Sequence, residues 1–235
     1  MNTHPFIDIF FKGKIWNLYF FSLIIMDDLE CRAIEQLLFT TSHPSNSLNF
    51  CVIVFHPQFA VTFRHPPHHN FVKNEIVKVW NVLNRMEYET TVFEISTECD
   101  FIVLKIISGT FPHSPRLNGS LYRGQVYFQV GVNGVREPFW KTGVISEKTM
   151  SFAVGTSLGS PGDSGSGVFD QNGNFIGIST AKQTFIFANG NFALCELADF
   201  QPYTKITDAI VIIHAAKLTA INCSRSGRQF RRLQC

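Results

Sequence analysis

The sequence predicts an all-β globular protein, and two observations support this fold class. From residue 39 onward the chain consists of short apolar segments bounded by turns, and their β-branched and aromatic residues are typical of strands. The clearest case is a hairpin in which residues 50–55 and 59–64 lie on either side of a break at Pro57. The 235 residues are 45% apolar and 16% charged, which is enough core material for one domain or two small ones.

The charge balance argues against a protein that binds nucleic acid. Lys and Arg total 20 against 18 Asp and Glu, a net charge of +2, whereas proteins that coat nucleic acid carry a larger imbalance. We therefore expect no nucleic-acid partner. His68 and His69 follow two prolines and are expected to be exposed loop side chains, because a zinc site would need further ligands in register. Since the chain has no metal or nucleotide motif, we expect no cofactor.

A glycine-rich loop at residues 159–167 is the most informative stretch of the chain. Four of its nine residues are glycine and Pro161 fixes one bend, so the sequence predicts a tight loop of definite shape. A serine hydroxyl such as that of Ser164, at its centre, becomes a good nucleophile only beside a base and N–H groups aimed at the developing oxyanion. The loop is therefore either a nucleophile loop or a plain turn between two strands.

Residues 162–166, Gly-Asp-Ser-Gly-Ser, resemble the nucleophile loop of the chymotrypsin-like serine peptidases, whose pattern is Gly-Asp-Ser-Gly-Gly. That family uses a histidine, an aspartate and a serine in this order along the chain. His65 ends a Thr-x-x-His segment like that of the family, except that the bulky Phe63 replaces a small residue. Asp100 leads an apolar strand that is similar to the family's Asp-Ile-Ala-Leu-Leu-Lys segment.

The resemblance covers residues 35–218 and implies a trypsin-like fold of two six-stranded antiparallel Greek-key β-barrels with a C-terminal α-helix. The barrels are expected at about residues 31–115 and 120–203, and the helix at about residues 204–218. Further segments that are similar to the family, and to its HtrA-like members in particular, are 124–131, 142–146, 175–181 and 202–207.

The resemblance also implies roles for individual residues. His65 would act as the base, Asp100 would orient it, and Ser164 would attack a peptide bond of a protein or peptide substrate. The N–H groups of Gly162 and Ser164 would form the oxyanion hole. The specificity pocket would have an apolar base, which favours small or apolar P1 side chains, and a lysine on its wall that could admit an acidic neighbour. The residues expected to line this pocket are Leu158, Thr180, Ala181 and Lys182.

The chain also departs from the family. Members activated by cleavage pair a freed amino terminus with the aspartate before the nucleophile, but no Ile-Val-Gly-Gly-like start precedes His65. Asp163 therefore needs another partner, and activity is expected to be constitutive or controlled by partners and localisation. A pseudoenzyme that binds peptides or serves as a scaffold is the alternative. An α/β acyl hydrolase is disfavoured, because its Gly-x-Ser-x-Gly motif needs a glycine where Ser166 stands.

The two ends of the chain are expected to lie outside the barrels. Residues 1–30 are apolar and could be a signal or anchor, a packed appendage, or a segment ahead of a start near Met26; membrane association is expected only through them. The basic residues 219–235 are expected to be a solvated tail. Six cysteines allow fifteen pairings, but Pro66 and Ser160 stand where secreted relatives usually have cysteines. This favours reduced thiols in an intracellular protein, with secretion as the alternative if residues 1–26 act as a signal.

Overall fold

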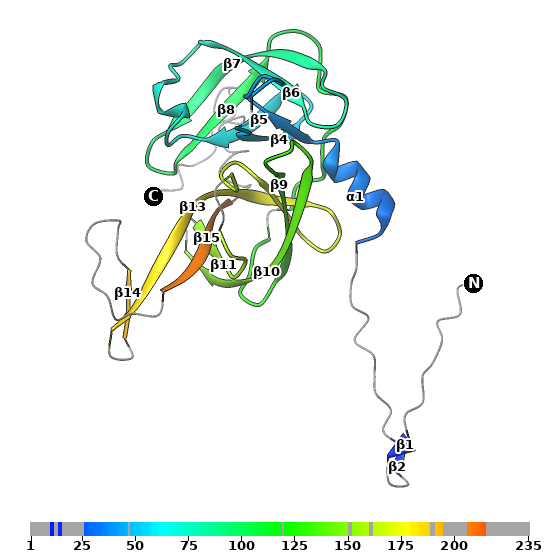
Figure 1. Ribbon diagram of the computed structural model, residues 1–235, viewed down its shortest axis with the longest axis vertical. Coiled ribbons are helices and arrows are strands. Elements are labelled where there is room, and N and C mark those ends of the chain that lie inside the picture. Colours follow the sequence, from blue (N-terminus) through cyan, green and yellow to red (C-terminus); the bar gives the residue numbers. More distant parts are fainter. Residues whose placement is uncertain are drawn as a thin grey trace, which may run out of the picture.

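Strand pairing divides the computed structural model into a closed barrel and a second, rolled sheet (Figure 1). The fold is therefore the predicted trypsin-like arrangement of two β units, although the helix at the C-terminal end is replaced as set out below. The structure describes residues 10–11, 14–15, 26–46, 48–118, 120–149, 152–159, 162–188, 191–194 and 206–214.

A short helix, α1 (Asp28–Glu35), precedes the first barrel. It begins where it does because the Asp27 side chain caps it, accepting a hydrogen bond from the Glu30 N–H at 2.8 Å. The helix packs through the buried Ile34, and Met26, just ahead of the cap, is buried in the same core. Met26, which stands before the expected domain boundary at residue 31, thus belongs to the packed core. Farther toward the N-terminus, β1 (Phe10–Phe11) pairs with β2 (Lys14–Ile15).

The first unit is a closed barrel of six antiparallel strands, in the order β3-β4-β5-β8-β7-β6. The predicted hairpin at Pro57 is confirmed as β4 and β5, and the predicted strand after Asp100 is confirmed as β8. Both faces of β4 and β5 are largely buried, which explains their nearly continuous apolar sequence. The strands are β3 (Leu38–Thr40), β4 (Cys51–His56), β5 (Phe59–Phe63), β6 (Ile76–Asn81), β7 (Glu87–Ser96) and β8 (Phe101–Ile106).

The second unit is a sheet in the order β12-β9-β10-β11-β15-β13-β14, and a further pairing of β12 with β13 rolls it back on itself. Its core includes Tyr127 and Ile145, whereas Phe169 and Phe175 pack into the core of the first barrel. The two units therefore share a hydrophobic contact. The strands are β9 (Val126–Val132), β10 (Pro138–Lys148), β11 (Phe152–Gly155), β12 (Gly167–Phe169), β13 (Phe175–Ala188), β14 (Asn191–Leu194) and β15 (Ile206–His214).

The predicted C-terminal helix at residues 204–218 is wrong over the residues that the structure describes. Residues 206–214 form β15, which pairs with both β11 and β13 (Figure 1). The isoleucines at 206, 210 and 213 fit a helical period, but the uninterrupted run Ile-Val-Ile-Ile at 210–213 is β-branched and so favours a strand. Two neighbouring strands supply backbone partners on both sides. Residues 215–218, the tail at 219–235 and the last three cysteines lie outside the described residues.

The expectation that His68 is an exposed loop side chain is also wrong, whereas His69 is exposed as expected. His68 begins the 3₁₀ turn η1 (His68–Asn70) and only 2% of its surface is exposed. Its ring stacks on Phe71, and its Nε2 lies 2.7 Å from the Thr41 hydroxyl. Burial lowers the pKa of His68 to about 4. No sequence pattern indicated this environment, because the residues that enclose the ring come from several separate segments.

Burial of a neutral His68 makes folding stability dependent on pH. Its folded pKa of about 4 lies below the ordinary value of 6.5, so the stability is fully present above about pH 6.5 and is lost as the pH falls toward 4. We expect wild type to lose about 2 to 3 kcal/mol of unfolding free energy from this group between about pH 7.5 and about pH 4.5. Urea denaturation at both pH values checks this. His68→Gln should show a smaller loss, and an equal loss in both proteins would contradict the assignment.

Candidate active site

His65 and Asp100 are brought together by the pairing of β5 with β8. Phe63, at the end of β5, pairs with Phe101, at the start of β8, so the residues just beyond these strand ends are neighbours. His65 Nδ1 lies 2.6 Å from Asp100 Oδ2, and the His65 backbone N–H donates to Asp100 Oδ1 at 2.8 Å. Because an ionised carboxylate only accepts hydrogen bonds, Nδ1 is the donor and Nε2 is the nitrogen that can accept a hydrogen bond.

Ser164 lies in a loop whose shape requires glycine at two positions. Gly162 and Gly165 have φ angles of +94° and +83°. At Gly165 a Cβ atom would lie 2.2 Å from the backbone oxygen of Cys51 in the first barrel, so no larger residue fits. The loop is tied to β13 behind it, because the Gly165 N–H donates to the Ser179 carbonyl at 2.7 Å. The Ser164 hydroxyl donates to the Thr180 carbonyl at 3.3 Å.

Two backbone N–H groups of this loop are available to a ligand. Within the described part of the chain, neither the Gly162 N–H nor the Ser164 N–H has a hydrogen-bond acceptor. The peptide that follows Gly162 is fixed from the interior, since the Cys51 thiol donates to the Gly162 carbonyl at 3.3 Å and accepts from the Val132 N–H at 3.3 Å. Burial raises the pKa of Cys51 to about 12, so the thiol keeps the proton that it donates.

Asp163 has the charged partner that the sequence called for but did not identify. Lys141, on β10, places its Nζ 2.5 Å from Asp163 Oδ2, and the two side chains are only 13% and 9% exposed. The same Nζ donates to the Leu158 carbonyl at 2.7 Å. One ammonium group therefore contacts both ends of the segment from residue 158 to residue 163.

The residues expected to line the specificity pocket lie close to the nucleophile loop but in different surroundings. The Leu158 side chain is 67% exposed, whereas Thr180, whose carbonyl accepts from Ser164, is 1% exposed. Ala181 and Lys182 belong to β13, and their side chains lie outside what the structure describes. At residues 157 and 158 it is Ser157 that turns inward.

A buried polar cluster beneath the loop was missed by sequence analysis. The Tyr127 hydroxyl donates to Ser157 Oγ at 2.7 Å, and Ser157 donates to Gln129 Oε1 at 3.0 Å. Gln129 in turn donates to Ser166 Oγ at 2.7 Å, which links the cluster to the nucleophile loop. One residue in the sequence, Gly143, could have pointed to this cluster. It lies opposite Tyr127 on the adjacent strand, where a Cβ atom would lie 2.3 Å from the tyrosine oxygen.

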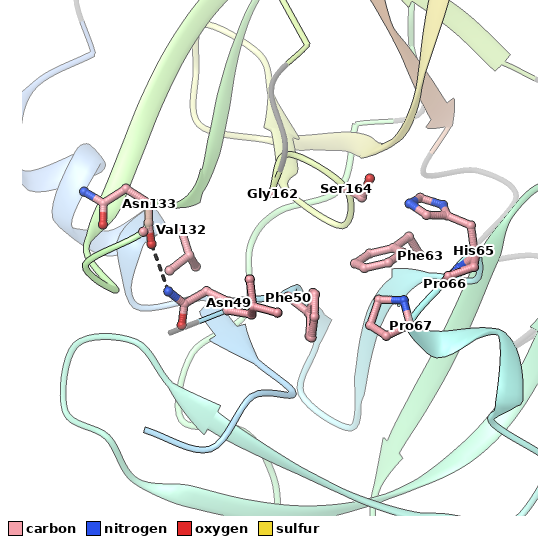
Figure 2. A pocket seen from close by; sticks show the side chains of 12 residues that line it. Asn49, Phe50, Phe63, His65, Pro66, Pro67, Val132, Asn133, Gly162 and Ser164 are labelled. Atoms are coloured by element: carbon pink, nitrogen blue, oxygen red, sulfur yellow. Dashed lines mark hydrogen bonds between the residues drawn. The ribbon is translucent and has the colours of Figure 1, made fainter. Parts of the chain in front are cut away.

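Ser164 and His65 face a common pocket of about 390 Å³ between the two barrels (Figure 2). Most of its wall is apolar, and at one end Asn49 donates to the Asn133 carbonyl at 2.9 Å. Gly162 belongs to the same wall. The remaining lining residues are Leu48, Phe50, Phe63, Pro66, Pro67, Val132 and Gly134.

The described residues also bear on metal binding and on membrane insertion. Among them, no cluster of three or more His, Cys, Asp and Glu side chains could hold a metal ion. No helix in the described ranges is both long and apolar enough to cross a membrane. The three cysteines there, Cys31, Cys51 and Cys99, are free thiols.

Comparison with known proteins places this arrangement in a class. The two-barrel fold is that of the trypsin-like serine peptidases. A family profile described as a trypsin-like peptidase domain matches residues 53–178, more than half of the chain, and the chain belongs to that family of peptidases. The matched range includes His65, Asp100 and Ser164.

A solved structure agrees on the fold. The chain is similar to the crystal structure of Rv3671c from M. tuberculosis H37Rv, a serine-to-alanine mutant in an inactive form. The TM-score is 0.57 at 15% sequence identity, and the match covers 88% of this chain and 95% of the other. No curated protein matches the sequence.

The contact between Gly165 and Cys51 predicts a strong effect of one added methyl group. We expect Gly165→Ala to cost more than about 3 kcal/mol of unfolding free energy, because it combines backbone strain with a steric overlap against a main-chain oxygen. Gly124→Ala is a matched control, since Gly124 also has a φ of +83° but has no atom within 4 Å of the added Cβ. It should cost about 1 kcal/mol. Equal losses in denaturant titrations would show that the overlap is relieved.

Proposed function

We propose that this protein is a serine endopeptidase that cleaves polypeptides through an acyl-enzyme. The observation that carries the proposal is the carboxylate-bound imidazole of His65, which lies with Ser164 in the wall of one pocket. Figure 2 shows the imidazole ring beside the serine. Membership of the trypsin-like peptidase domain family supports the same reaction class.

In the proposed reaction His65 Nε2 takes the proton of Ser164 as the oxygen attacks the peptide carbonyl. The serine hydroxyl now donates a long 3.3 Å bond to Thr180, and a rotation about its Cα–Cβ bond would direct it to the imidazole. Asp100 holds the ring and stabilises the imidazolium that forms. The imidazolium then protonates the leaving amine, and water, activated by the same base, releases the acid product.

The oxyanion of the tetrahedral intermediate would be bound by the N–H groups of Gly162 and Ser164. These two groups lack acceptors among the described residues, and the glycine-rich backbone keeps side chains away from them. Donors fixed in advance stabilise developing charge without reorganisation during the reaction, and each is worth about 3 to 4 kcal/mol in related chemistry.

A polypeptide with apolar side chains near the scissile bond is the proposed substrate. The apolar wall of the pocket supports this choice, since it includes Phe50, Phe63 and Val132. We retain the proposal of small or apolar P1 residues: the exposed Leu158 offers apolar surface beside the loop, and Thr180 and Ala181 precede Lys182 on the adjoining strand.

One observation favours a second candidate, a peptide-binding protein without turnover. The Ser164 hydroxyl is bonded to Thr180 and not to His65. If that bond persists with a peptide in the pocket, the serine would not be activated. The two candidates differ in whether Ser164 reacts.

Fluorophosphonate labelling of the full chain tests the proposal, with mass spectrometry to locate the adduct. We expect labelling at Ser164 that is lost in Ser164→Ala and His65→Ala, and a loss of about a million-fold in turnover for either change. Asp100→Asn should lower turnover by about ten-thousand-fold, because the ring loses its orienting carboxylate. A folded wild-type protein that does not label would overturn the proposal in favour of the peptide-binding candidate.

The apolar pocket predicts a change in substrate preference. Leu48 stands at its rim with 66% of its surface exposed, and Leu48→Glu should lower kcat/KM about tenfold for peptides with an apolar residue next to the scissile bond. Leu29→Glu, at an exposed leucine on α1, is the control and should leave kcat/KM unchanged. A library of peptides varied on both sides of the cleaved bond measures this. Equal kinetics in the two variants would exclude Leu48 from substrate contact.

A further inference from the structure

We propose that Lys141 is a built-in substitute for the activating amino terminus. Its ammonium group holds the oxyanion-binding loop in the working conformation, so that activity needs no cleavage ahead of His65. This inference rests on the proposed endopeptidase function and identifies how its site is regulated. Lys141 is a positioning residue, since its ammonium group contacts Asp163 and the Leu158 carbonyl and Lys141 is not among the described residues that line the pocket.

The contacts of Lys141 span the segment that carries the Gly162 donor. Nζ lies 2.5 Å from Asp163 Oδ2 and 2.7 Å from the Leu158 carbonyl. Asp163 stands directly between Gly162 and Ser164, the two residues whose N–H groups are the proposed oxyanion donors. A group that fixes the Asp163 side chain therefore fixes the peptides on both sides of it.

The position of the ammonium group is itself determined by the second sheet. Lys141 lies in the long ladder between β9 and β10, opposite Gln129. Its Nζ also lies 5.0 Å from the centre of the Phe139 ring, two residues earlier on the same face of the strand. The lysine thus extends from a paired strand and not from a mobile loop, which reduces the entropy lost when it contacts Asp163.

The charge of Lys141 matters because the pair is shielded from solvent. The exposed fractions of 13% and 9% leave the ammonium and carboxylate groups little hydration, so each depends on the other for compensation. The downstream part of the loop has separate support, because Ser166 donates to the Asp163 carbonyl through its N–H at 3.0 Å. Loss of Lys141 should therefore affect mainly the stretch from Leu158 to Asp163, where the oxyanion donor lies.

The experiment compares the full chain with Lys141→Met, Lys141→Arg and Lys105→Met. Lys105 is a matched control: it lies on a strand of the first barrel, β8, and its Nζ lies 6.0 Å from the centre of the Phe93 ring, away from the nucleophile loop. We expect Lys141→Met to lower kcat and the fluorophosphonate labelling rate about 100-fold to 1,000-fold, with KM changed less than about threefold. Lys141→Arg should recover most of the rate, and Lys105→Met should match wild type.

The outcomes separate this inference from the function on which it rests. If wild type does not label, the endopeptidase proposal fails. If wild type labels and Lys141→Met labels at the same rate, the proposal for Lys141 is overturned while the endopeptidase proposal stands. Lys141→Gln keeps a hydrogen-bond donor without the charge and serves as the second variant should Lys141→Met not fold. Wild-type kcat in folded Lys141→Gln would equally overturn the role of the charge.

Discussion

The candidate active site depends on the close fit of the nucleophile loop against the backbone of Cys51. Gly165 approaches the Cys51 carbonyl so closely that a Cβ would lie 2.2 Å from it, and the Cys51 thiol reaches the Gly162 carbonyl at 3.3 Å. The same Cys51 carbonyl accepts from the hydroxyl of Thr62 at 2.7 Å, and Thr62 lies on β5 three residues before His65. One residue of the first barrel therefore sets the position of a loop from the second barrel relative to the histidine. A catalytic pair built from two barrels needs such a fixed junction, since small displacements cost large factors in rate.

Three partly or fully buried aspartates in the described structure are compensated in different ways, and the differences follow from what each must do. Asp170 closes a turn after β12: burial tends to raise its pKa, but hydrogen bonds from Asn174 and Asn118 outweigh this and lower it. Asp163 is paired with a full charge from Lys141, and Asp100 with the ring of His65. Amide donors suffice for a turn. A positive charge is suited to a loop that must stay fixed, whereas the imidazole beside Asp100 is a group that can itself gain and lose a proton.

How much could be predicted from the sequence depends on how local each feature is. The strand before His65 and the glycines around Ser164 are local, so the two barrels and the three candidate residues could be placed without the structure. The strand β15 could not be predicted, because its β-branched isoleucines also fall at helical spacing and so fit either element. Its pairing with β11 and β13, which selects the strand, is visible only in the structure. The contact between Lys141 and Asp163 could not be predicted either. It depends on the register of β9 with β10 and on the path of a loop, and no sequence motif identifies this lysine. Leu158 was expected to line the pocket, but its side chain is exposed and that of the preceding residue, Ser157, is buried.

Phe63 is the departure from the family pattern closest to the chemistry, and the structure gives it a definite environment. Its ring centre lies 4.4 Å from that of His65 and 4.4 Å from that of His68, at interplanar angles of 32° and 31°. The Phe63 ring therefore contacts both imidazoles. Burial, the largest cause, together with the nearby His65, keeps the pKa of His68 at about 4, so His68 is neutral at neutral pH. Because a second positive charge against the same phenyl ring would disfavour the imidazolium that the proposed mechanism requires, a neutral His68 favours the proposed role of His65 as a base.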